Sequence, residues 1–233
     1  MRTYILLCAA FVSTFASAQQ TILNSPSADV MGTHQLYFRS DSAYFPGAVV
    51  GTEAPNFIYG LGHNIEAGIN INAFATPADT NERAIVPNAK WKFLSTKSSQ
   101  PVHFDMYLGD QLFVPTFHRT FNAGNFLYAA GAISHKDTRF TFGGWDSESV
   151  VAPGNRGGEL FGLEQTVAHQ NDRNVVTLAA DWQSGRGANG ALALGVMFFP
   201  NERLMIIPAF QIANSGDHAA NGPQLFIGYL LRK

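Results

Sequence analysis

The chain has one cysteine, few charged residues and no long hydrophobic run. The cysteine, Cys8, lies in a short apolar stretch, Tyr4–Phe11, which follows a basic second residue and precedes the small residues Ala16–Ala18. This order predicts a signal peptide over residues 1–18 that is cleaved after Ala18, because the apolar stretch is far shorter than the about 20 residues needed to span a membrane. The mature chain then lacks thiols, which excludes disulfides and thiolate metal sites.

Charge is scarce and nearly balanced. Without the signal peptide the chain keeps 14 Lys+Arg against 17 Asp+Glu, a net charge of -3, which gives no general attraction to nucleic acid. Charged residues make up only 14% of the chain, whereas Gly (22) and Phe (19) are abundant. This composition suits a surface that meets lipid. Since no apolar run is long enough for a spanning helix, a membrane protein of this kind must be a closed β-barrel.

The mature chain has a hydrophobic period of two, as in Ile65–Asn72, Val102–Leu108 and Val176–Gln183, which is typical of strands with two unlike faces. About twelve such strands are predicted: His34–Ser40, Asn56–Gly62, Asn64–Phe74, Ile85–Leu94, Val102–Gly109, Asn125–Ser134, Thr138–Trp145, Gly158–Ala168, Asn174–Ser184, Gly190–Phe199, Arg203–Ala213 and Gln224–Leu231. We therefore predict an all-β fold, a single up-and-down antiparallel transmembrane barrel over residues 34–233, after a short polar lead over residues 19–33.

Short and long connectors alternate along the chain. The short ones are His63, Ser95–Gln100, His135–Asp137, His169–Arg173 and Pro200–Glu202, and the long ones are Asp41–Pro55, Ala75–Ala84, Asp110–Gly124, Asp146–Gly157, Gly185–Asn189 and Asn214–Pro223. This alternation predicts tight turns at the periplasmic rim and longer loops at the outer rim, as outer-membrane barrels have.

Strand charges fall on the face opposite the apolar one. A Lys or Arg facing lipid at mid-membrane costs about 2–4 kcal/mol, so these side chains should turn into the barrel. The candidate lumen-lining or solute-binding residues are Arg39, Glu66, Asn70, Lys90, Lys92, His103, Asp105, Tyr107, Arg139, Glu164 and Asp181. Two arrangements stay open. Opposite charges pair across a narrow barrel and close it, or they segregate on opposite walls and orient a dipolar solute.

Two strands fit the pattern less well, because Val196–Phe199 and Leu204–Ile207 are apolar on both faces. Either side chains fill part of the interior there, or these strands belong to a soluble two-layer core. The aromatic residues that suit interfacial girdles, with core packing as the alternative, are Trp91, Trp145, Trp182, Tyr128 and Tyr229.

No hydrolase, zinc, phosphate-loop or calcium-loop motif appears in the sequence. Gly185–Gly190 resembles a phosphate loop only in its glycine content. His103 and Asp105 share a strand face, as a catalytic dyad or a metal pair would, but a polar barrel interior explains them equally well. We therefore predict no metal, no cofactor and no enzymatic activity.

The segment Pro55–Asn70 (PNFIYGLGHNIEAGIN), together with the strand array, resembles bacterial outer-membrane barrels grouped as transporters. The most similar family is the one assigned to the MetA pathway of phenol degradation. The resemblance implies a barrel that passes small, apolar or aromatic compounds, and it brings no catalytic residues. One departure is the C-terminus, Tyr229–Lys233, which does not end on the aromatic residue that helps many such barrels to insert.

These features predict an outer-membrane protein of a Gram-negative bacterium that acts as a passive channel or transport-related barrel. Its expected partners are membrane lipid and small solutes. One alternative is a closed structural or adhesive barrel that binds partners through outer loops such as Asp146–Gly157, beside an exposed Trp145. Another is a soluble periplasmic or secreted β-protein.

Overall fold

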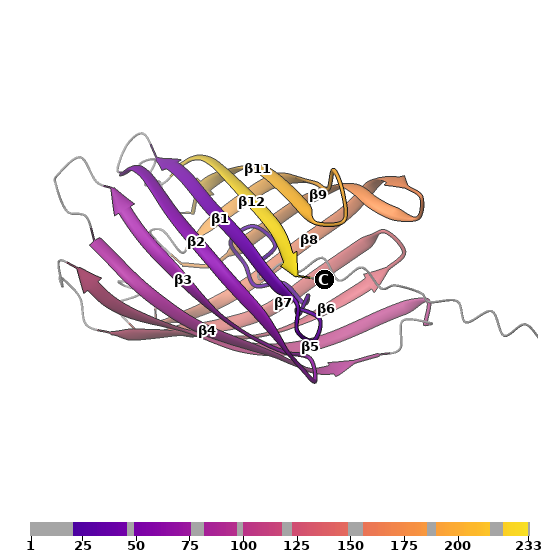
Figure 1. Ribbon diagram of the computed structural model, residues 1–233, viewed down its shortest axis with the longest axis horizontal. Helices are drawn as coiled ribbons and strands as arrows, with labels where there is room; N and C mark the ends of the chain where they lie inside the picture. Colours follow the sequence, from indigo (N-terminus) through magenta and orange to yellow (C-terminus); the bar gives the residue numbers. More distant parts are fainter. Residues whose placement is uncertain are drawn as a thin grey trace, which may run out of the picture.

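The structure is a closed barrel of twelve antiparallel strands, each paired with its neighbours in sequence (Figure 1). The computed structural model describes residues 21–45, 49–75, 82–96, 100–117, 123–148, 156–185, 190–214 and 221–232. The strands are β1 (Leu36–Phe45), β2 (Val49–Gly62), β3 (Ile65–Ala75), β4 (Glu82–Ser95), β5 (Val102–Phe117), β6 (Gly124–His135), β7 (Thr138–Ser147), β8 (Gly157–Gln170), β9 (Arg173–Gln183), β10 (Ala191–Phe198), β11 (Leu204–Ala213) and β12 (Gly222–Arg232). The predicted signal peptide and its cleavage site lie outside the described residues.

The ring closes where β1 pairs with β12, for example at Phe38 opposite Tyr229. The predicted fold class is thus confirmed. Two strands are much longer at the loop rim than the sequence suggested: β1 runs to Phe45 and β2 begins at Val49, inside the expected loop Asp41–Pro55. Backbone pairing continues there because hairpin strands gain hydrogen bonds from each other whether lipid or water surrounds them.

The tight turns at the other rim depend on residues that tolerate positive φ. His63 and Asn64 have φ of 52° and 59°, and Asn171 and Asp172 have φ of 51° and 58°. Two consecutive residues in this region make the two-residue turn whose twist matches that of antiparallel strands. Asn and Asp are among the few non-glycine residues that adopt it readily, so these positions fix the hairpin register.

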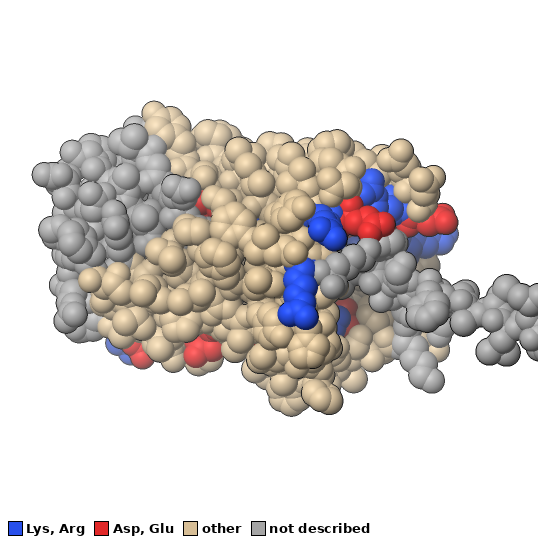
Figure 2. Space-filling view, in the orientation of Figure 1, with Lys and Arg blue, Asp and Glu red and all other residues tan. Residues whose placement is uncertain are grey.

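The outer face carries an apolar belt. Its large side chains are 36–53% exposed, and they include Ile69, Met106, Leu108, Phe140, Phe142, Leu163, Val167, Leu178, Phe210 and Ile212. Charged residues are sparse on the side of the barrel seen in Figure 2 and gather towards one end. Such a belt is what a lipid-facing barrel needs. No helix of the described residues is long and apolar enough to cross a membrane.

Among the strand residues whose side chains the structure describes, three carboxylates belong to the outward set, and all three lie towards the loop rim. Asp110 pairs with Leu127, which pairs with Asp146, so the two carboxylates lie at one level of the wall. Glu159, near the start of β8, pairs with Gly144, two residues below Asp146. Because carboxylates avoid hydrocarbon, this level marks the loop-side limit of the apolar belt.

The aromatic residues divide between the two faces. Trp91 and Tyr229 are exposed on the outside. The girdle prediction is wrong for Trp145 and Tyr128, which are both 4% exposed and belong to an aromatic cluster inside the barrel, where Trp145 stacks on Phe126 at 5.5 Å. Trp145 lies an even number of residues from Arg139 on β7, and even spacing on a strand places both side chains on the same face.

Trp182 lies on the outer side, stacked on Phe161 at 5.8 Å, and its indole N–H donates to Asn214. The adhesive alternative expected an exposed Trp145 beside the outer loop, but the structure places this side chain inside the barrel.

Candidate functional site in the barrel interior

Residues Thr21–Gly32, here called the inner segment, coil inside the barrel rather than leading up to it (Figure 1). Ile22, Leu23 and Ala28 are at most 1% exposed. The coil is closed by a backbone hydrogen bond from Ile22 N to Ser25 O of 2.7 Å and a bridge between Thr21 and Pro26. A chain folded back on itself in this way fills more of the interior than an extended strand would.

The inner segment enters the barrel at the turn rim, past Gly60 of β2. His34 N donates to Gly60 O (2.9 Å), and Gly60 N donates to Gln35 O (3.0 Å). A Cβ atom on Gly60 would overlap the carbonyl oxygen of Gly32. Only glycine therefore allows the two backbones to approach so closely.

Asp181 of β9 holds the tip of the inner segment. One of its carboxylate oxygens, Oδ2, accepts the backbone N–H groups of Leu23, Asn24 and Ser25 at 2.9, 2.8 and 2.7 Å. Successive N–H groups that converge on one anion form a compact anion-binding turn. Asp181 is 2% exposed, so peptide N–H groups of the inner segment take the place of water around Oδ2.

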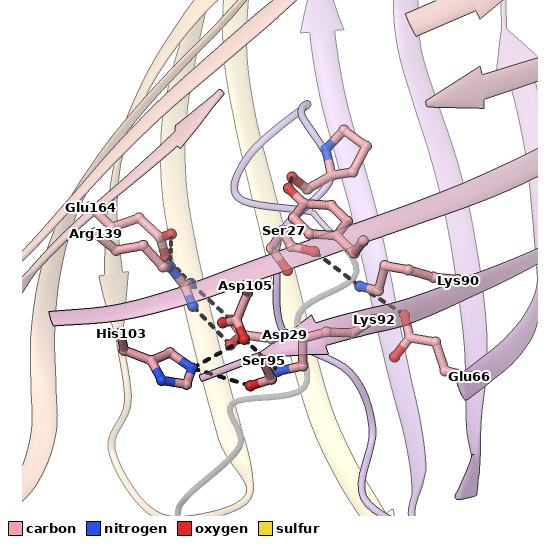
Figure 3. Close-up of polar contacts among 12 residues, drawn as sticks. Ser27, Asp29, Glu66, Lys90, Lys92, Ser95, His103, Asp105, Arg139 and Glu164 are labelled. Atoms are coloured by element: carbon pink, nitrogen blue, oxygen red, sulfur yellow. Dashed lines mark hydrogen bonds and ion pairs between the residues drawn. The ribbon is translucent and has the colours of Figure 1, made fainter. Parts of the chain in front are cut away.

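Arg139 of β7 forms ion pairs with two carboxylates (Figure 3). Its Nη1 and Nη2 donate to the two oxygens of Asp29, both at 2.8 Å, while its Nε and Nη2 donate to Glu164 of β8 at 2.5 and 2.7 Å. Burial alone would raise the pKa of the Asp29 carboxyl, but Arg139, helped by Lys92 and Lys90, holds that pKa below its ordinary value. Asp29 is therefore held as an anion mainly by Arg139, with a contribution from the two lysines.

A second group of wall residues binds the middle of the inner segment. Lys90 Nζ (β4) pairs with Glu66 of β3 at 2.9 Å and donates to Ser27 O at 3.2 Å. The other oxygen of Glu66 accepts the Met31 N–H at 2.8 Å. The Tyr107 hydroxyl of β5 donates to the Pro26 carbonyl at 2.8 Å. Lys90, Glu66 and Tyr107 are almost fully buried, so the inner segment takes the place of water around them.

The start of the inner segment is held from the opposite part of the ring. Arg39 of β1, paired with Asp41, donates to the Thr21 hydroxyl at 2.8 Å. Asn24 contacts three glutamine side chains. Its Nδ2 donates to Gln211 at 2.9 Å. Its backbone carbonyl accepts from Gln183 at 3.2 Å, and its Oδ1 accepts from Gln224 at 3.3 Å.

Apolar contacts also contribute, and they explain the two strands that were apolar on both faces. Met197, Met205 and Ile207 point inwards and form one buried cluster with Ile22 and Leu23. Of the two interpretations, filling of the interior is therefore correct, although the filling comes from the N-terminal chain. The two-layer arrangement is wrong, because the sheet closes into one ring.

The remaining candidates are Lys92, His103 and Asp105, near the turn rim of β4 and β5, and Asn70 on β3. Lys92 and His103 both approach Asp105 Oδ1, at 3.6 and 3.0 Å. Asn70 accepts a hydrogen bond from Asn88 at 2.9 Å. No group of three metal-ligating side chains occurs among the residues that the structure describes.

A serine also approaches His103, but the geometry is not that of a hydrolytic triad. Ser95 Oγ lies 3.4 Å from His103 Nε2, and Asp105 contacts that same ring nitrogen (Figure 3). In a triad the nucleophile and the carboxylate occupy opposite nitrogens of the imidazole. The Thr96 hydroxyl lies 3.3 Å from Nδ1 and accepts the Phe104 N–H. Ser95, His103 and Asp105 therefore do not have the arrangement of a hydrolytic triad.

The charges follow neither arrangement left open by the sequence. Lys90 pairs with Glu66, Lys92 with Asp105, and Arg139 with Glu164, each across adjacent strands of the wall. Opposite signs thus neither meet across the barrel nor segregate to opposite walls. Sequence reasoning missed Asp29 and the whole inner segment, whose only signals are the apolar pairs Ile22-Leu23 and Val30-Met31 in a lead expected to be polar.

No family model and no curated protein matches the chain. The predicted likeness to the MetA-pathway family is thus not supported by such a match. Among solved structures, the chain is similar to the Salmonella typhi outer-membrane phospholipase dimer with bound calcium, with 9% identity over 86% of this chain and 91% of that chain and a TM-score of 0.50. At this identity the likeness concerns the barrel fold alone.

Two other solved structures resemble the chain more weakly. Escherichia coli outer-membrane phospholipase A matches with 8% identity over 88% of this chain and 98% of that one, at a TM-score of 0.49. Acinetobacter baumannii Omp33 matches with 10% identity over 84% and 98%, at 0.47. Neither match supports an argument about activity.

Proposed function

We propose that the protein is an outer-membrane barrel for the passage of small polar solutes, and that the inner segment closes the barrel at rest and moves to open it. The observation that carries this proposal is the way the segment is held. The inner segment forms hydrogen bonds and ion pairs with side chains from β1, β3, β4, β5, β7 and β9. It is not a strand of the sheet.

The polar character of these contacts favours a segment that leaves its place. Ion pairs buried for stability alone gain little, because well-packed apolar side chains of similar size are as stabilising or more so. A wall that carries Asp181, Arg139, Lys90 and Glu66 is compatible with a closed and an open state of the barrel. The inner segment supplies the hydrogen-bond partners of these groups in the closed state, and water supplies them in the open state. Ile22 and Leu23 oppose release, at about 2–3 kcal/mol each for the loss of burial.

The outer membrane is the location that best fits these features. The closed ring has no free strand edge, its outer face is apolar, and its interior is charged. A closed barrel satisfies every backbone group in lipid, as a spanning β-protein must. The predicted signal peptide would export the chain towards that membrane.

One observation favours a second candidate. The interior is filled by tightly held chain, which is also what a permanently closed structural barrel would show. The two candidates differ in one property: the inner segment moves in a channel and stays in place in a structural barrel. Single-channel recording separates them.

Gly60→Ala tests the proposal without changing any charge or any residue of the inner segment. A methyl group at this position collides with the Gly32 carbonyl, a backbone atom that cannot swing aside, so the segment must shift. We expect this variant to conduct in planar bilayers, whereas the wild-type protein stays closed for most of the recording.

The matched control is Gly144→Ala, where the added methyl group meets only one carbonyl oxygen, of Gly158, at 3.3 Å. This variant should behave as the wild-type protein does. Both variants should show the shift in gel mobility on boiling that is typical of a folded barrel. A folded Gly60→Ala barrel that never conducts would favour the structural alternative.

A further inference from the structure

The contact between Asp29 and Arg139 has the form of a bound ligand. Two parallel N–H···O bonds, both of 2.8 Å, join the guanidinium edge to the carboxylate. This bidentate arrangement is the strongest and most selective contact that arginine makes with a carboxylate. The other edge of the guanidinium is fixed by Glu164, a wall residue that stays with Arg139 when the inner segment leaves.

Two further donors point at oxygen atoms of the inner segment close to Asp29. The Tyr107 hydroxyl meets the Pro26 carbonyl, and the Lys90 ammonium meets the Ser27 carbonyl. In Figure 3, Lys90 points towards Ser27 and Arg139 towards Asp29, each from its own strand. This part of the wall, formed by β4, β5 and β7, therefore offers three donor groups to the inner segment: the guanidinium of Arg139 for a carboxylate, and a hydroxyl and an ammonium for neutral oxygens.

We propose that Arg139, Tyr107 and Lys90 form the solute site of the barrel, and that its ligands are small carboxylates with a further hydroxyl or carbonyl oxygen. At rest the inner segment occupies this site with the Asp29 carboxylate and two peptide carbonyls. A solute of the same chemistry competes with the segment for the site and thereby favours the open barrel. This inference rests on the proposed function and adds the solute class to it.

The donors at the site favour a carboxylate over a neutral solute. One edge of Arg139 is bound by Glu164 and the other by Asp29, and Lys92 and Lys90 also attract Asp29. Removal of the Asp29 carboxylate leaves the second edge of the guanidinium without its acceptor in a narrow interior, where charge interactions are stronger than in bulk water. A carboxylate that binds there regains both charge-assisted hydrogen bonds, whereas an amide of the same shape offers only one acceptor oxygen and no charge.

The test uses lactate as the probe and lactamide as its neutral counterpart, titrated by calorimetry into the detergent-solubilised protein. The receptor is the barrel that lacks residues 21–31, in which the inner segment no longer competes. We expect lactate to bind at least about tenfold more tightly than lactamide, because charge-assisted hydrogen bonds are roughly twice as strong as neutral ones. Arg139→Gln in the same background should remove this preference.

Arg39→Gln is the matched control, because it neutralises an arginine on β1 that pairs with Asp41 and not with Asp29. The preference for lactate should survive this change. Equal binding of lactate and lactamide, or a preference that Arg39→Gln also removes, overturns the inference. If the shortened barrel conducts but shows no preference, only the solute class is wrong. If lactate binds through Arg139 but the shortened barrel never conducts, the channel function is wrong and the binding site stands.

Discussion

Deletion of residues 21–31 is expected to turn a closed barrel into one that is open for most of a bilayer recording. The wild-type inner segment is held by three hydrogen bonds to the Asp181 carboxylate and by the ion pair between Asp29 and Arg139, among other contacts. Hydrogen bonds to charged groups contribute about 1.5–3 kcal/mol each, so their combined loss should raise the open fraction by about 100-fold or more.

The deletion also permits a reconstitution control. A synthetic peptide with the sequence of residues 19–33, added from the turn side, should close the shortened barrel again in proportion to its concentration. A scrambled peptide of the same composition should not. A shortened barrel that is folded, as judged by its gel mobility before boiling, and yet never conducts would show that something other than the inner segment closes the interior.

Asp181→Ala is expected to have the largest effect of any single substitution in the wall. It leaves the N–H groups of Leu23, Asn24 and Ser25 without their acceptor in a buried position. A buried donor that loses its partner costs about 1–3 kcal/mol, so the seated position of the inner segment should weaken by about 3 kcal/mol or more. The open fraction in single-channel recordings should then rise by about 100-fold.

Gln183→Ala provides the comparison for Asp181→Ala, because it lies two residues away on β9 and faces the same segment. It removes one neutral hydrogen bond, of 3.2 Å, to the Asn24 carbonyl. A neutral hydrogen bond contributes about 0.5–1.5 kcal/mol, so the open fraction should rise by about tenfold at most. Equal effects of the two substitutions would mean that the three N–H groups do not hold the segment.

The barrel could be predicted from the sequence because its signals are local. Alternation along each strand separates Leu163 from Glu164 and Phe140 from Arg139, and the structure places the first of each pair outside and the second inside. The same rule of parity would have placed Trp145 inside, since it is six residues from Arg139 on one strand. The girdle prediction ignored this rule because tryptophan suits the membrane interface as well as a packed interior.

The inner segment could not be predicted, because its contacts join residues that are far apart in sequence. Asp181 lies 156–158 residues from the N–H groups that it binds, and Arg139 lies 110 residues from Asp29. The segment has no periodicity to show which wall it faces. The pairing of charges also depends on strand register, which brings Lys90 opposite Glu66 only after the hairpin between β3 and β4 has formed.

The most direct test of the account is the accessibility of Ala28 in the folded protein. Ala28 is 1% exposed inside the barrel, whereas Thr33, at the entrance, is exposed. The mature chain is expected to lack cysteine, so Ala28→Cys and Thr33→Cys each introduce a single thiol. In outer-membrane vesicles, a water-soluble maleimide should label Thr33→Cys quickly and Ala28→Cys only after the barrel has been unfolded by heat. Equal rates of labelling at the two positions in the folded barrel would contradict the claim that the chain closes its own interior.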